Sequence, residues 1–174
     1  GGPQKYVVRA RAAGVKTLHV VASVLHGQKA AAKGVDGIIV VGGEAGGHPP
    51  PSQVSTLVLT RAISQACPNI PLVAAGGIVD GAGIAALLAL GADAAQLGTR
   101  YLVTKEATVH QNYKDVVLAA GPDDTRLVGA GMSPIRMLNN DFARRFLQAE
   151  QSGESVEHRK EVFASSSLKM AALG

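Results

Sequence analysis

The feature that most constrains the fold is a unit that occurs four times in the first hundred residues. Each unit is a short apolar run, a turn of small residues and a segment with helical spacing. The apolar runs read as strands, which lie at residues 17–22, 37–41, 72–75 and 94–97. Strands that alternate with helices form parallel sheets, since a parallel connection needs a crossover, and these crossovers are right-handed. The sequence therefore predicts an α/β fold.

Helices are predicted between these strands and before the first of them. Ser23 and Asp80 stand where N-cap residues are favoured, and glycines at 14, 34 and 91 stand where helices end. The predicted helices span residues 5–13, 25–33, 56–66 and 81–90.

Composition is typical of one soluble globular domain with an ample apolar core. Of 174 residues, 47% are hydrophobic and 17% are charged, and aromatic residues make up only 3%. The core must therefore be built from Val, Ile, Leu and Ala, as in parallel sheets covered by helices. The net charge is +4, but Lys and Arg are scattered and no basic run is interleaved with aromatic residues. Nucleic-acid binding is not indicated.

The single cysteine, Cys67, excludes an internal disulfide and a cysteine cluster for zinc. It suits a reducing compartment, so we expect a cytoplasmic protein and no metal site. No apolar span of 18 residues and no charged-then-apolar leader is present, so neither membrane insertion nor export is indicated.

Two architectures fit four such units: a doubly wound open sheet, or a (β/α)8 barrel of which half is present. A doubly wound dinucleotide fold has its glycine-rich turn after the first strand, where this chain has SVLHGQ. A barrel holds phosphate in the loops after its last two strands. Here those loops are Gly76-Gly77 and Gly98-Thr99, which offer backbone N–H groups and a hydroxyl. This favours the barrel, although tight packing of strand against helix is an equally good explanation for either pair alone.

The loop after the second strand is rich in glycine; strand and loop together have the sequence GIIVVGGEAGGH at residues 37–48. Its glycines let a ligand approach the backbone closely, and His48 is the only side chain there that titrates near neutral pH. His48 is therefore a candidate base beside a bound ligand. The alternative is an ordinary turn with an exposed histidine.

Beyond residue 102 the pattern changes. One or two helices are predicted over residues 103–120, followed by a turn at 121–124 and a short extended piece at 125–129. Residues 129–137 are predicted as a loop, and further helices are predicted over 140–151 and 161–173. We therefore expect two parts: residues 1–102, which carry the βα units, and residues 103–174, a helical extension packed on them.

Several segments resemble the nitronate monooxygenase family, formerly called 2-nitropropane dioxygenases, and the related flavin-dependent enoyl-acyl carrier protein reductase. The matching segments are GVDGIIVVGGEAGGHP, PLVAAGGI, DGAGIAALLALGADAAQLGTRYL and TKEATVHQNYKD, and the resemblance extends from about residue 5 to residue 150. General FMN barrels share the glycine turns but not the last segment, which is therefore the most specific.

The resemblance implies a TIM barrel that binds FMN, of which this chain is similar to the C-terminal half, strands five to eight, plus the helical extension. The family's first four strands and their flavin-contacting loop have no counterpart here. An amino-terminal half or a second copy would therefore complete the barrel, since a half-barrel leaves strand edges open. Residue by residue, the resemblance assigns His48 as catalytic base and Gly46 and Gly47 to the flavin or substrate. It assigns Gly76, Gly77, Gly98 and Thr99 to the FMN phosphate and Gln96 to the flavin.

The implied activity is FMN-dependent oxidation of nitroalkanes or alkyl nitronates with O2, which yields carbonyl compounds and nitrite. One alternative is an FMN- and NAD(P)H-dependent enoyl-acyl carrier protein reductase. Another is a nucleotide dehydrogenase resembling IMP dehydrogenase, which needs a nucleophilic cysteine in a loop, whereas Cys67 stands at a helix end. The last is a half-barrel interaction module without catalysis.

Overall fold

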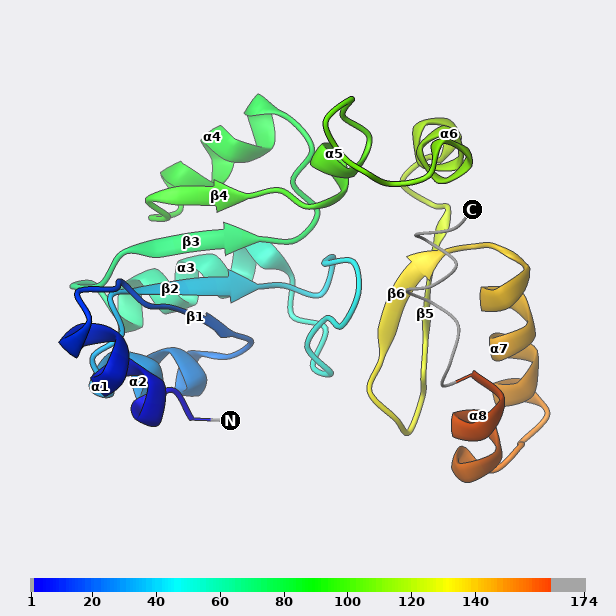
Figure 1. Cartoon of the computed structure of the whole chain (residues 1–174), viewed down its shortest axis with the longest axis horizontal. Coiled ribbons are helices and arrows are strands. Elements are labelled where there is room, and N and C mark those ends of the chain that lie inside the picture. Colours follow the sequence, from blue (N-terminus) through cyan, green and yellow to red (C-terminus); the bar gives the residue numbers. More distant parts are fainter. Residues whose placement is uncertain (1, 164–174) are drawn as a thin grey trace. The chain divides into compact units, whose positions relative to one another are not determined.

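The computed structural model describes residues 2–163, which form two compact units (Figure 1). Unit 1 comprises the chain up to Ala45 together with Pro49–Leu97. Within the described residues, unit 2 comprises Gly46–His48 together with residues 98–163. No helix in the described range is both long and apolar enough to cross a membrane.

Unit 1 contains a four-stranded parallel sheet with helices between its strands. The strands are β1 (Leu18–Val21), β2 (Gly37–Val41), β3 (Leu72–Ala75) and β4 (Ala94–Gln96). The helices are α1 (Gln4–Ala12), α2 (Val24–Ala32), α3 (Thr56–Ala66) and α4 (Gly81–Ala89). Every boundary lies within one residue of its prediction from sequence, and the predicted caps form: Ser23 accepts a hydrogen bond from His26 N, and Asp80 from Gly83 N.

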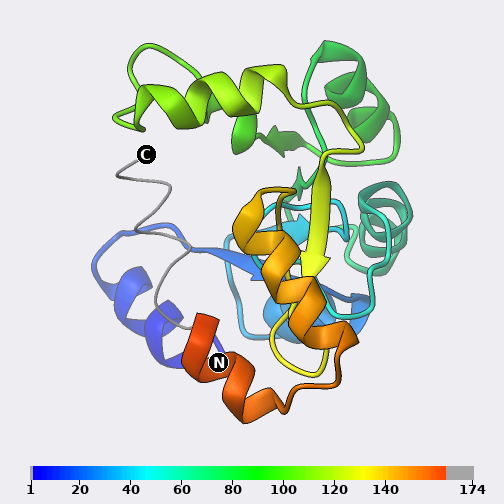
Figure 2. The ribbon, with the colours of Figure 1, turned by 90° about the vertical axis from the view of Figure 1, so that its right-hand side faces the viewer.

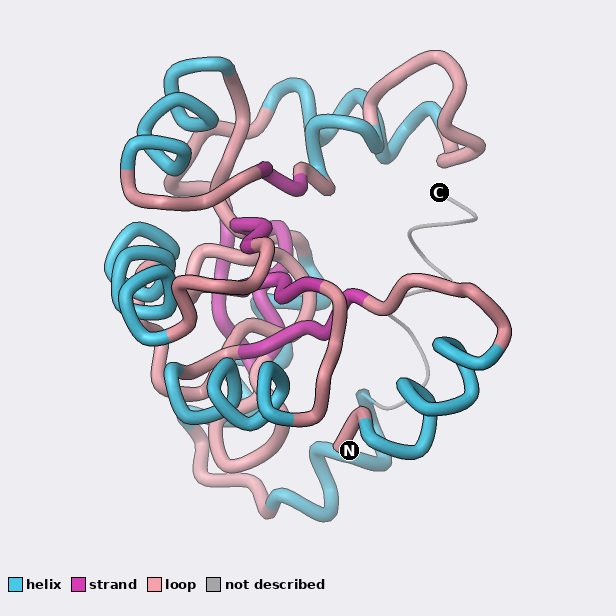
Figure 3. The backbone as a smooth tube through the Cα atoms, turned by 90° about the vertical axis from the view of Figure 1, so that its left-hand side faces the viewer, coloured by secondary structure: helices cyan, strands magenta, loops and turns pink. Residues whose placement is uncertain are grey.

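The strand order bears on the two architectures that the sequence left open. The strands pair in the order β1-β2-β3-β4, so each strand lies beside the next one in the chain. Right-handed crossovers that always step in one direction place their helices on one face of the sheet. Accordingly, α2, α3 and α4 lie on one side of the strands (Figure 3). A doubly wound sheet needs a reversal of strand order, and the described strands contain none.

The core of unit 1 lies between the sheet and these helices. Ile38, Val40 and Ile63 are fully buried there, and each contributes roughly 1.5–3 kcal/mol through burial of its side chain. The opposite face of the sheet is more open, because Leu18 and Val20 of β1 are 58% and 56% exposed. Within unit 1, the described helices thus cover one face of the sheet.

In two places, an aspartate side chain links neighbouring strands at their amino-terminal ends. Asp36 Oδ2 accepts hydrogen bonds from Thr17 N at 2.8 Å and Thr17 Oγ1 at 3.0 Å. Asp93 Oδ2 accepts one from Leu72 N at 2.8 Å. Each aspartate follows a helix that ends in a glycine with positive φ. These aspartates therefore link β2 to the start of β1 and β4 to the start of β3.

Unit 2 contains a two-stranded antiparallel sheet, β5 (Thr125–Val128) and β6 (Ile135–Leu138), and four helices within the described residues. These are α5 (Thr99–Leu102), α6 (Gln111–Ala119), α7 (Asp141–Gln151) and α8 (Val156–Phe163). Helix α7 packs on β5 (Figure 2), and its Phe142 and Phe146 join Val128 in a small core. The predicted turn, extended piece and helix over 140–151 are confirmed.

Two predictions for this region are wrong in part. Residues 103–110 are turns and not helix, because the amine of the buried Lys114 binds Thr104 O at 2.7 Å and Ala107 O at 2.8 Å, which a continued helix would use internally. Residues 135–137 were predicted as loop but lie in β6, which pairs with β5. The helix predicted over 161–173 begins earlier, at Val156, and most of its range lies outside the described residues.

Candidate active site

The loops that follow β2 and β3 pack against each other at the carboxyl-terminal edge of the sheet in unit 1. Glu44 Oε2 accepts a hydrogen bond from Thr56 N at 2.8 Å and lies 2.9 Å from Thr56 Oγ1. Thr56 is the first residue of α3 and is only 3% exposed. Its hydroxyl also lies 3.0 Å from Gly76 O, and since it carries one proton it donates to one of these acceptors at a time. Sequence reasoning assigned no role to Glu44 or Thr56.

Close packing against neighbouring residues explains both glycines of the Gly76-Gly77 turn. Their φ angles are +113° and +69°, which side chains rarely adopt. A Cβ at Gly76 would lie 2.9 Å from Thr56 Oγ1, and one at Gly77 would lie 2.9 Å from Glu44 Cβ. Tight packing, which the sequence left open as the alternative, therefore accounts for these glycines. A role in phosphate binding would be an additional one.

The two glycine pairs of the GGEAGG loop differ in their surroundings. A Cβ at Gly42 would meet the backbone of Thr56, and one at Gly43 would lie 2.8 Å from Gln53 O. At Gly46 and Gly47, and also at Gly98, an added Cβ would meet no described atom within 4 Å. Packing explains the first pair, whereas the second pair and Gly98 border open space that a ligand can occupy.

Backbone N–H groups are available at both predicted phosphate turns. Within residues 2–163, the amides of Gly76, Gly77, Gly98 and Thr99 donate no hydrogen bond. Unpaired amides at the ends of parallel strands are suitable donors for a phosphate group. Gly76, Gly77 and the exposed Gln96 belong to unit 1, and Gly98 and Thr99 belong to unit 2.

His48 is exposed and belongs to unit 2, as do Gly46, Gly47, Gly98 and Thr99. Its neighbour Gly47 exchanges two backbone hydrogen bonds with Arg136 of β6: Arg136 N donates to Gly47 O at 2.7 Å, and Gly47 N donates to Arg136 O at 3.0 Å. The imidazole itself makes no hydrogen bond to any described residue. A fixed backbone and a free ring leave His48 able to exchange a proton with a ligand.

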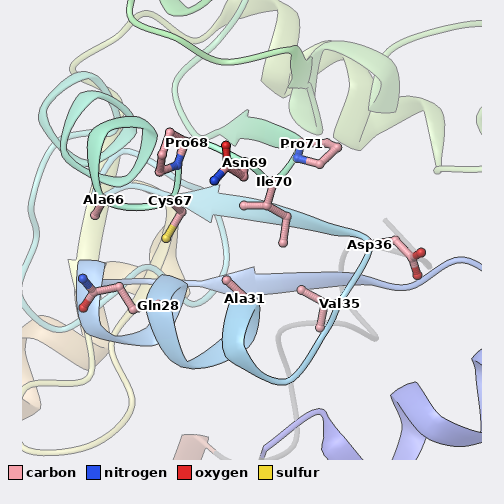
Figure 4. A pocket seen from close by; sticks show the side chains of 10 residues that line it. All are labelled: Gln28, Ala31, Val35, Asp36, Ala66, Cys67, Pro68, Asn69, Ile70 and Pro71. Carbon is pink, nitrogen blue, oxygen red and sulfur yellow. The ribbon is translucent and has the colours of Figure 1, made fainter.

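A cavity of about 460 Å³ lies at the other end of the strands (Figure 4). It is lined by residues from α2, by the last residue of α3 and by the segments that precede β2 and β3, and none of them is a predicted site residue. Cys67 in its wall is 9% exposed, and burial raises the pKa of its thiol. A protonated thiol is a poor nucleophile, which argues against the cysteine-dependent dehydrogenase alternative. Among the described residues, no group of three His, Cys, Asp or Glu side chains could hold a metal ion.

Comparison with known proteins identifies a family. A family model described as nitronate monooxygenase matches residues 1–173. A nitronate monooxygenase of Paraburkholderia phytofirmans is 37% identical over 131 residues, which are 71% of this chain and 36% of that protein. A 5-hydroxy-7a-methyl-1-oxo-octahydro-1H-indene-4-carboxyl-CoA dehydrogenase of Rhodococcus jostii is 43% identical over 141 residues, 80% of this chain and 39% of that protein.

The fold is similar to that of FabK from Thermotoga maritima, with a TM-score of 0.91 and 39% identity over 99% of this chain and 54% of that chain. The chain thus spans between about a third and about half of the length of these relatives.

Proposed function

Because the chain belongs to the nitronate monooxygenase family, we propose that it is part of an FMN-dependent oxidoreductase that oxidises nitroalkanes or alkyl nitronates with O2 to carbonyl compounds and nitrite. The observation that carries this proposal is His48, a free imidazole on a fixed loop beside glycines that border open space. Since the relatives are longer, the activity is proposed for the whole protein of which this chain supplies His48.

The described residues fit the cofactor that the family implies. The unpaired amides of Gly76, Gly77, Gly98 and Thr99 would bind the phosphate of FMN, and the Thr99 hydroxyl would add a donor. Gly46 and Gly47 would lie against the flavin ring or the substrate, where a side chain would take up the space, and Gln96 would contact the flavin. When bound, FMN would accept the electrons of the substrate.

His48 would act as the base. A neutral imidazole can accept the α-proton of a nitroalkane, and the resulting imidazolium would then face the anionic nitronate. The two hydrogen bonds between Gly47 and Arg136 would hold the backbone next to the imidazole during this transfer. A preformed nitronate has already lost this proton, so it would depend less on the base.

The chain would contribute the C-terminal half of the barrel. The strand order without reversal, the helices on one face and the exposed apolar side chains of β1 support strands five to eight of an eight-stranded barrel. In this proposal residues 1–102 form the half-barrel and residues 103–174 the helical extension, and an amino-terminal half or a second copy completes it. The buried, unpaired Cys67 suits the cytoplasm.

The test is flavin binding followed by turnover. The whole protein that contains this chain is purified and mixed with FMN, and FMN binding is followed by quenching of flavin fluorescence. Nitrite is then measured after addition of a nitronate in air. Binding together with nitrite release is expected. Binding of FMN without nitrite from any nitronate would refute the monooxygenase activity, and the absence of flavin binding would favour the non-catalytic interaction module.

A thioester-directed activity is the second candidate, because the likeness to FabK, an FMN enoyl-acyl carrier protein reductase, covers 99% of the chain and the Rhodococcus relative is named for a CoA thioester. The same preparation separates the two. NADH oxidation that requires an enoyl thioester, with no nitrite from nitronate, would favour the reductase.

A further inference from the structure

Glu44 contacts more of the structure than capping of helix α3 requires. Helix α3 already has an N-cap, since Ser55 Oγ accepts a hydrogen bond from Val58 N at 3.3 Å. Glu44 adds a carboxylate at the same end, where the helix dipole favours negative charge; it accepts a hydrogen bond from the Thr56 amide, and its Oε2 also lies 2.9 Å from the Thr56 hydroxyl. The Glu44–Thr56 contact thereby joins the beginning of the long loop between β2 and α3 to its end.

The same pair lies against the turn that follows β3. Thr56 Oγ1 lies 3.0 Å from Gly76 O, and the space where Gly77 would carry a side chain is filled by Glu44 Cβ. One carboxylate thus fixes Thr56, and Thr56 and Glu44 together border the two glycines whose amides donate no hydrogen bond within the described residues. Thr56 and Glu44 therefore contact the backbone of the turn, while the N–H groups of Gly76 and Gly77 remain without an acceptor among the described residues.

We propose that Glu44 is a positioning residue: by holding Thr56 against the Gly76-Gly77 turn, it fixes the orientation of the amides that receive the phosphate of the flavin. This proposal rests on the proposed function, since it takes Gly76 and Gly77 to be part of the phosphate site. Glu44 itself does not contact the phosphate. It acts through Thr56 and through the packing of the turn.

The chain offers a matched control. Replacing Ser55 by Ala removes the ordinary cap of α3, whereas replacing Glu44 by Ala removes the contact with Thr56, and both changes affect the same helix end. Glu44→Gln keeps an oxygen acceptor for the Thr56 amide without the charge, and it serves as the conservative variant. If Glu44 were only a second cap, Glu44→Ala and Ser55→Ala would behave alike.

The first measurement is amide hydrogen exchange of the protein without flavin, read at Gly42, whose N–H donates to Ala75 O at 3.1 Å directly before the turn. Glu44→Ala is expected to accelerate exchange at Gly42 at least several-fold, Ser55→Ala only in the first turn of α3, and Glu44→Gln little in either place. Unchanged exchange at Gly42 in Glu44→Ala would overturn the proposal whether or not the protein binds flavin.

The second measurement compares FMN with riboflavin, which lacks the phosphate. Glu44→Ala is expected to weaken FMN binding about tenfold, the low end for losing hydrogen bonds to a charged group, and to leave riboflavin binding unchanged. Glu44→Gln should restore most of the preference for FMN. Equal weakening of both flavins, or equal effects of Glu44→Ala and Ser55→Ala, would refute the positioning role.

The two measurements also separate this proposal from the proposed function. If the unmodified protein bound no flavin, the cofactor assignment and with it the phosphate role of Glu44 would fail, and the exchange data would still decide whether Glu44 holds the turn.

Discussion

Gly47 and Arg136 exchange two backbone hydrogen bonds, of 3.0 and 2.7 Å, although they come from distant parts of the chain. They form an isolated antiparallel bridge between the glycine loop and the outer side of β6, whose other side pairs with β5. The residue that follows Gly47 is His48. The hairpin of unit 2 therefore fixes the backbone from which the candidate base extends.

Replacing His48 by Asn should lower turnover of a neutral nitroalkane by about 10²–10⁴-fold, the usual contribution of a general base, and should lower turnover of the preformed nitronate much less. Nitrite release with each substrate measures this. His26→Asn, an exposed position on α2, is the control and should change neither rate. Equal losses on both substrates in His48→Asn would contradict the base role.

Replacing Arg136 by Pro removes the N–H that donates to Gly47 O, while Arg136→Ala keeps both backbone bonds. The Arg136 N–H points away from β5, so a proline at this position should leave the β5–β6 pairing intact. Loss of one such bond costs about 0.5–1.5 kcal/mol, and we expect faster exchange of the Gly47 amide, which donates to Arg136 O, in the proline variant only. The same rates in the two variants would show that this bridge does not fix the loop.

Two glycines should respond in opposite ways to alanine. Gly42→Ala places a methyl group against the backbone of Thr56 and should destabilise unit 1 by about 1–3 kcal/mol, as overpacking does. Gly98→Ala points into open space and should change stability by less than about 0.5 kcal/mol, yet weaken binding of FMN. Thermal unfolding and flavin titration of both variants check this, and undiminished flavin binding by Gly98→Ala would exclude Gly98 from the site.

Acid stability should depend on Asp36. The amide of Thr17, the Lys16 amine and the Thr17 hydroxyl lower the pKa of Asp36 from 3.8 to about 2. Since this pKa is lowered on folding, the ionised carboxylate stabilises the fold above pH 3.8, and this stabilisation is lost as the pH falls towards 2.

Asp36→Asn should therefore be less stable at neutral pH, and its stability should change less between pH 4 and pH 2 than that of the unmodified protein. Lys16→Ala should have a smaller effect, because the Thr17 amide remains bound to Asp36. Urea unfolding across this pH range is the measurement. Parallel stability curves for Asp36→Asn and the unmodified protein would count against the assignment.

The elements of unit 1 could be predicted because their signals are local. Helix α3 and strand β3 have the predicted bounds, since cap residues, glycines and prolines mark helix ends through contacts within a few residues. The glycine turns and His48 were found in the same way, because each is a short run at the end of an apolar strand. Their assignment to a flavin site stays a prediction.

The features that the sequence did not reveal depend on distant residues. The buried Lys114 holds residues 103–110 out of a helix by binding carbonyl groups in an earlier segment. Strand β6 exists because β5 and Gly47 pair with its two sides, and nothing in the run from Gly129 to Met137 signals either partner. Glu44 appeared in sequence as one residue of a glycine-rich loop, and its role follows from Thr56 and the turn after β3.

The sequence by itself determined where the strands and helices of unit 1 begin and end, and which loops carry glycines and a histidine. Only the tertiary structure decided the order of the strands, which glycines are needed for packing and which border open space, and which residues hold the His48 loop. The physical reason is that caps and turns act over a few residues of chain, whereas sheet pairing and side-chain packing join residues that only the folded chain brings together.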